Sequence, residues 1–99
     1  MTAEVAARLA AFGISLMAET RAYWIFTRGD CLALVHWNDT GFASVGSSGM
    51  LTESGLAYLV WREGCPWLVA KQTEHAAEVE QVERIRQFSA DLKAALGIQ

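Results

Sequence analysis

Residues 22–37 read AYWIFTRGDCLALVHW and carry the clearest structural signal of the chain. Two runs rich in aromatic and branched side chains, Ala22 to Arg28 and Cys31 to Trp37, lie on either side of Gly29-Asp30. A Gly-X dipeptide between two such runs is typical of a β-hairpin with a two-residue type II′ turn. The turn fixes the register, because a shift of one residue would move every side chain to the other face of the sheet.

This register divides the side chains of the hairpin between two faces. One face has no polar group at its central positions, and we expect the helices to cover it. It carries Trp24, Phe26, Ala33, Val35 and Trp37. The opposite face combines apolar bulk with polar tips, as protein interfaces do, so we predict it to be the interface. It carries Tyr23, Ile25, Leu32, Leu34 and His36.

A second hairpin is predicted further along the chain. Its strands are Ala57 to Arg62 and Cys65 to Ala70, and Glu63-Gly64 forms the two-residue turn between them. Shorter strands are expected at Ile14 to Ala18 and at Phe42 to Val45. One face of the second hairpin would carry Tyr58, Val60, Trp67 and Val69, and the other Ala57, Leu59, Trp61 and Leu68.

A helix is predicted near each end of the chain. The first runs from about Ala3 to Phe12 with Thr2 as N-cap, and we expect Gly13 to end it in a left-handed conformation. The alternative is a helix that continues through Gly13, in which Leu16 would extend the apolar stripe at a cost of about 1 kcal/mol for the glycine. The second lies between Thr73 and Leu96, repeats apolar residues at steps of three and four, and ends at Gly97. The predicted fold is α+β, with an antiparallel sheet of about five strands built from two hairpins. The N-terminal helix and the longer C-terminal helix would pack on one face.

The composition indicates a single globular domain over residues 1–99. Hydrophobic residues make up 53% of the chain and charged residues 19%, which allows a core. The net charge is −3, and the eight basic residues are scattered, which argues against nucleic acid and anionic membranes as partners. The N-terminal residues lack the charge pattern of a secretory signal, and two cysteines are too few for a disulfide framework. We therefore expect a soluble cytoplasmic protein.

The cysteines and histidines do not form a recognisable catalytic or metal-binding motif. Cys31 and His36 are five residues apart in one predicted strand, so their side chains should point to opposite faces. Cys31, His36, Cys65 and His75 do not have metal-ligand spacing. We predict no catalytic residue, no metal site and no cofactor.

Gly46 to Gly55 is the loosest stretch of the sequence and is predicted to be a loop. Its Gly46-Ser47-Ser48-Gly49 segment resembles an anion-binding turn, but it lacks the lysine of a P-loop and is one residue shorter than a nucleophile elbow. We interpret it as a flexible connector and a possible ligand loop. Thr52 to Leu56 could form either a helical turn or part of the loop.

The expected function is that of a non-enzymatic protein–protein interaction module, working as a homodimer or as a small adaptor. The order of elements is similar to that of small acidic secretion chaperones, which dimerise and hold an extended partner chain. The similarity covers the pattern of elements alone, and it implies the alternative that this protein binds an extended chain. A second alternative is a small enzyme or ligand-binding domain that uses the Gly46–Gly55 loop together with His36 or Cys31.

Overall fold

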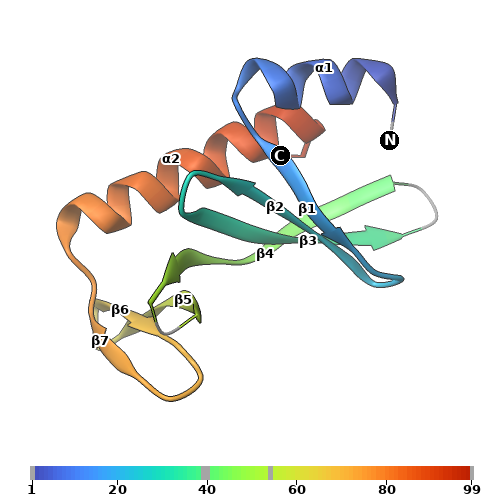
Figure 1. Ribbon diagram of the computed structural model, residues 1–99. Helices are drawn as coiled ribbons and strands as arrows, with labels where there is room; N and C mark the ends of the chain where they lie inside the picture. Colours follow the sequence, from blue (N-terminus) through green and yellow to red (C-terminus); the bar gives the residue numbers. More distant parts are fainter. Residues whose placement is uncertain (1, 39–40, 54, 99) are drawn as a thin grey trace.

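The computed structural model describes residues 2–38, 41–53 and 55–98 of the chain. The helices are α1 (Ala3–Ala11) and α2 (Val79–Leu96). The strands are β1 (Ser15–Glu19), β2 (Tyr23–Arg28), β3 (Cys31–Asn38), β4 (Gly41–Thr52), β5 (Gly55–Arg62), β6 (Cys65–Val69) and β7 (Glu74–Ala76). They form one antiparallel sheet in chain order, and both helices lie on the same side of it (Figure 1).

The prediction of about five strands is wrong, because the described residues form a sheet of seven. The predicted Gly46–Gly55 loop continues β4 instead, and Thr52 pairs with Gly55 at the start of β5. Ser54 and the turn residues Asp39 and Thr40 lie outside the described residues. β4 pairs with β3 from Gly41 to Met50, interrupted by two register shifts, and this tertiary gain outweighs the low strand propensity of glycine and serine.

The C-terminal helix also begins later than Thr73, the earliest start predicted from the sequence. Glu74–Ala76 forms β7, which pairs with β6, and α2 begins only at Val79. Glu78 and Gln81 form a reciprocal capping box there, which satisfies backbone N–H groups that have no partner within the helix. These side-chain caps fix the boundary that the apolar spacing alone could not locate.

The hairpins and their faces are confirmed. Arg28 pairs with Cys31 around Gly29-Asp30, and Gly29 has φ 60° as a type II′ turn requires. Arg62 pairs with Cys65 around the second two-residue turn. The resulting register places Trp24 opposite Val35, Phe26 opposite Ala33, Tyr58 opposite Val69 and Val60 opposite Trp67.

The predicted end of the first helix is confirmed as well. The Gly13 N–H donates to the Ala10 carbonyl at 3.0 Å, and the Ile14 N–H donates to the Leu9 carbonyl at 2.9 Å. These two bonds with Gly13 at φ 70° are the Schellman arrangement, which brings Ile14 back onto Leu9 in the core. The same arrangement, built on Gly97, ends α2.

The core lies between the helices and the sheet face that was predicted to be covered. Phe26 and Val35 of the first hairpin are fully buried there together with Phe88 and Leu92 of α2. Trp24 stacks on Trp37 at 5.2 Å between ring centroids and closes the end of the core. Of the described helices, neither α1 nor α2 lies on the other face of the sheet (Figure 1).

One irregularity of the sheet positions the candidate site. β4 pairs with β3 along its length, with two register shifts, but it pairs with β5 only from Gly49 to Thr52. At the point of divergence the two backbones are very close, since a Cβ atom on Gly49 would lie 1.9 Å from the Ala57 carbonyl oxygen. Beyond it, residues 42–48 of β4 lie beside β3 on one side, and no strand in the described part of the chain pairs with them on the other.

Candidate functional site

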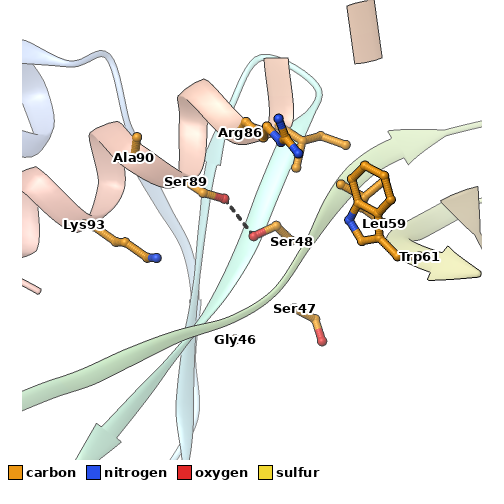
Figure 2. Close-up of a pocket in the computed structure, with 10 residues that line it drawn as sticks. Gly46, Ser47, Ser48, Leu59, Trp61, Arg86, Ser89, Ala90 and Lys93 are labelled. Carbon is orange, nitrogen blue, oxygen red and sulfur yellow. Dashed lines mark hydrogen bonds between the residues drawn. The ribbon is translucent and has the colours of Figure 1, made fainter. Parts of the chain in front are cut away.

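A groove opens where β5 separates from β4, and α2 forms its third wall (Figure 2). We call it the β4 groove. Its volume is about 460 Å³, within the range of sites that bind ligands. Its lining consists of Gly46, Ser47, Ser48, Leu59, Trp61, Ile85, Arg86, Ser89, Ala90 and Lys93.

The α2 wall of the groove is polar and cationic. Arg86, Ser89 and Lys93 follow one another at steps of three and four residues, so they lie on one side of the helix. Each of them directly follows a buried residue of the apolar stripe. The side of α2 that faces the groove therefore lies next to the buried apolar side of the helix.

The strand wall is joined to the helix wall by two hydroxyl groups. The Ser48 Oγ and Ser89 Oγ atoms are 2.9 Å apart, at hydrogen-bonding distance (Figure 2). Ser48 lies opposite Ala33 in the ladder, which places it on the core face of the sheet and directs it at α2. Only one of the two hydroxyl protons is used between them, so the other remains available to a ligand in the groove.

Two cations that form no ion pair with the described residues give the groove its charge. The ion pairs of the described residues use Arg8, Arg28, Arg62 and Arg84, and no carboxylate of the described residues lines the groove. The Arg86 guanidinium lies 5.6 Å from the centroid of the Trp61 ring, and Trp61 is 50% exposed. Lys93 extends from α2 toward β4 (Figure 2). The groove is therefore suited to a negatively charged group.

Free backbone groups of β4 also face away from β3. The residues beside a two-residue turn form a hydrogen-bonded pair, and such pairs alternate along an antiparallel ladder. Cys31 therefore directs its backbone polar groups at β2, and so do Ala33 and Val35. Val45 and Ser48 lie opposite Val35 and Ala33, so their N–H and C=O groups point away from β3. No strand of the described residues pairs with them on that side.

The predicted ligand loop is only partly at this site, and it is not a loop. Gly46, Ser47 and Ser48 line the groove as part of β4, whereas Gly49 is buried at the crossing with β5. Ser47 points away from α2, so Ser48 supplies the one side chain of this segment that faces the helix (Figure 2). Ser48 lies in the ladder opposite Ala33, and Gly46 and Ser47 lie in the register shift between Ser48 and Val45, so the segment is an interrupted part of β4 and not a phosphate-cradling turn.

The predicted interface residues lie on the face without helices. Tyr23, Ile25 and Leu34 are half-buried, and His36 is exposed. The prediction of Leu32 as an interface residue is wrong, because its side chain is 0% exposed within its own chain and cannot contact a partner. The second hairpin adds half-buried residues to the same face, and we call this combined surface the outer face. It consists of Tyr23, Ile25, Leu34, His36, Tyr58, Val60, Trp67 and Val69.

The thiol and imidazole groups do not meet. Cys31 is buried on the core face, where burial raises the pKa of its thiol and keeps it neutral. His36 lies on the outer face, and Cys65 is an exposed free thiol next to the second turn. Within the described ranges, no group of three or more His, Cys, Asp or Glu side chains could hold a metal ion.

The α2 wall of the groove was not predicted from the sequence. Arg86, Ser89 and Lys93 were not distinguished from the other polar residues of the last helix, and Trp61 was assigned only to a sheet face. A usable signal was present, because cationic and hydroxyl residues recur at helical spacing beside the apolar stripe. That signal could not indicate which strand the helix side would meet.

Comparison with known proteins found no relative of this chain. No protein-family model, no curated protein and no solved structure matches the chain. Of α1 and α2, the helices in the described part of the chain, neither is long and apolar enough to cross a membrane.

Proposed function

We propose that this protein is a non-enzymatic protein–protein interaction module that works as a homodimer through its outer face. The observation that carries the proposal is the apolar character of a sheet face with no helix on it (Figure 1). Antiparallel sheets with one face in water normally carry polar side chains on that face. Here the paired residues Ile25 and Leu34 are apolar, and so are Val60 and Trp67.

A second copy of the chain is a suitable partner for this face. Its central positions carry no charged side chain, so two copies could associate without burying unpaired charges. Arg62 and Glu74 lie toward one end and form an ion pair with each other at 2.8 Å. A two-fold dimer uses the same patch on both subunits, which requires a patch compatible with itself.

The chemistry of the cysteines and of the surface agrees with this proposal. A neutral, buried Cys31 thiol on the face opposite His36 supports a role without nucleophilic catalysis. The free thiols of Cys31 and Cys65 support a reducing, cytoplasmic location. The net charge of −3 supports a protein partner over nucleic acid.

The test is the mass of the protein in solution. Light scattering at micromolar concentration should give about twice 10.8 kDa. Leu34→Asp should halve that mass and leave the circular dichroism spectrum unchanged, because it places a charge in the centre of the proposed interface. Val79→Asp is the matched control, since Val79 is 75% exposed at the start of α2 and lies outside the outer face.

A folded wild-type monomer would refute the proposal, and so would a Leu34→Asp protein that stays dimeric. If Leu34→Asp fails to fold, Tyr23→Asp tests the same face at the end of the hairpin. It should then give the monomer mass with an unchanged spectrum.

A further inference from the structure

We infer that the β4 groove binds an extended, acidic segment of a partner protein, which adds to β4 as an extra strand. This inference concerns a surface other than the outer face and goes beyond the proposed dimer. It depends on two features that meet at one place, the free backbone edge of β4 and the cationic side of α2.

The free edge determines the conformation of the ligand. Val45 and Ser48 point backbone N–H and C=O groups away from β3, and the part of the chain that the structure describes supplies no strand to receive them. An extended peptide laid beside β4 would satisfy these groups through main-chain hydrogen bonds, as in β-strand addition. A helix or a small anion could not pair with both residues.

The α2 wall determines the charge of the ligand. Arg86 and Lys93 are two turns apart, have no carboxylate partner among the described residues, and line the groove with Ser48 and Ser89. A carboxylate would receive charge-assisted hydrogen bonds from the cations and the free hydroxyl proton. Acidic side chains at alternate positions of an extended segment would all face α2, because side chains alternate along a strand.

Trp61 provides apolar contact at one end of the groove. Its ring is half-exposed, and the Arg86 guanidinium lies over it at 5.6 Å, which holds both side chains in place before a ligand arrives. Tryptophan and arginine are the residues most often found to dominate binding energy at protein interfaces. An apolar side chain that replaces the acidic one at the α2-facing position next to Trp61 would pack on its ring and fix the position of the peptide along β4.

The test uses a fluorescein-labelled decapeptide that alternates Glu with Val, titrated with the protein in low salt and followed by fluorescence anisotropy. Saturable binding is expected, and Arg86→Gln with Lys93→Gln should weaken it at least tenfold. The matched control is Arg21→Gln with Lys71→Gln, which removes the same charge from two basic residues outside the groove and should leave the affinity unchanged. Circular dichroism verifies that both double variants fold.

Two further peptides and a competition with inorganic phosphate separate strand addition from simple charge attraction. The same decapeptide with N-methylated backbone amides should bind at least tenfold more weakly, and so should one with Lys in place of Glu. Inorganic phosphate at millimolar concentration should not displace the labelled peptide. No binding by wild type, equal binding of the N-methylated peptide, or displacement by phosphate would each overturn the inference.

The outcome is independent of the proposed dimer. Leu34→Asp changes the outer face and leaves the groove residues intact, so it should bind the peptide with wild-type affinity. Loss of dimerisation with retained peptide binding would separate the two surfaces. Loss of peptide binding in a folded Leu34→Asp protein would show that the groove requires the dimer, and would overturn the inference as stated.

Discussion

The glycines of β4 differ in what surrounds them, although the sequence presents them as similar. A Cβ atom on Gly49 would lie 1.9 Å from the Ala57 carbonyl oxygen and 2.8 Å from the Tyr58 Cα, which are backbone atoms. A Cβ atom on Gly46 would be 2.9 Å from His36 Nε2, at the end of an exposed side chain that can rotate away. Only Gly49 is therefore required for the crossing of β4 and β5.

The Gly49→Ala substitution should lower the free energy of unfolding by about 3 kcal/mol or more, because the strands must separate to admit the methyl group. Gly46→Ala is the matched control and should cost less than about 1 kcal/mol. Urea denaturation followed by circular dichroism measures both. Equal costs for the two variants would show that β4 and β5 are not in close contact at Gly49.

Both ends of α2 are fixed by specific caps. Glu78 and Gln81 cap its start, and Gly97 at φ 73° allows the Ile98 N–H to donate to the Lys93 carbonyl at 2.9 Å. Because α2 supplies both the core stripe and one wall of the β4 groove, its position determines the geometry of the groove.

The Gly97→Val substitution should lower the free energy of unfolding by roughly 1–2 kcal/mol, since a branched side chain is disfavoured in the left-handed conformation. Gly97→Asn should cost less, because asparagine adopts this conformation more readily. Thermal unfolding gives the comparison. An unchanged melting temperature for the valine variant would contradict the assigned end of α2.

β7 is a short edge strand, and the ion pair between Glu74 and Arg62 links it to β5. The hydrogen bond from Arg62, followed by its positive charge, lowers the pKa of the Glu74 carboxyl group. The pKa of Glu74 is lower in the folded state than in the unfolded state, so the ion pair stabilises the fold at pH values above the unfolded glutamate pKa of about 4.3. This stabilisation is lost as the pH falls through the pKa of Glu74 in the folded state.

An NMR titration of the Glu74 carboxyl group should therefore give a midpoint below that of an ordinary glutamate. Arg62→Gln should raise the midpoint, because it removes both the hydrogen bond and the charge. Arg86→Gln, remote from Glu74 in the described contacts, is the control and should leave it unchanged. The same midpoint in wild type and Arg62→Gln would rule out the ion pair in solution.

At the scale of the whole molecule, Arg28 links the sheet to both helices. From β2 it donates to the Asp91 carboxylate of α2 at 2.8 Å and to the Phe12 carbonyl at the end of α1 at 3.2 Å. Its guanidinium also lies 5.4 Å from the Phe88 ring centroid. The two layers are thus joined by a half-buried cation as well as by the apolar core.

The Arg28→Gln substitution should lower the free energy of unfolding by roughly 1–3 kcal/mol, because it leaves Asp91 half-buried without its cation. Arg84→Gln breaks a more exposed ion pair, with Asp30, and should cost at most about 1 kcal/mol. Urea denaturation of both variants gives the comparison. Equal, small losses would mean that Arg28 does not join the layers.

The elements with local signals could be predicted from the sequence. A Gly-X turn between two aromatic runs specified the first hairpin, its register and its faces, and the glycines after two apolar stripes specified where the helices end. These features depend on turn chemistry and on residues a few positions apart. The same logic identified the face with Tyr23, Ile25 and Leu34, although not the burial of Leu32.

The remaining features depend on contacts between segments that are distant in the sequence. The Gly- and Ser-rich segment from Gly46 has little propensity of its own and became a strand because β3 lies beside it, and β7 formed because β6 offered an edge. The β4 groove likewise joins Ser48 to Ser89 and Trp61 to Arg86, residues from separate elements. Such contacts arise from where β5 diverges and where α2 crosses the sheet, and neither is encoded in the neighbouring residues of the chain.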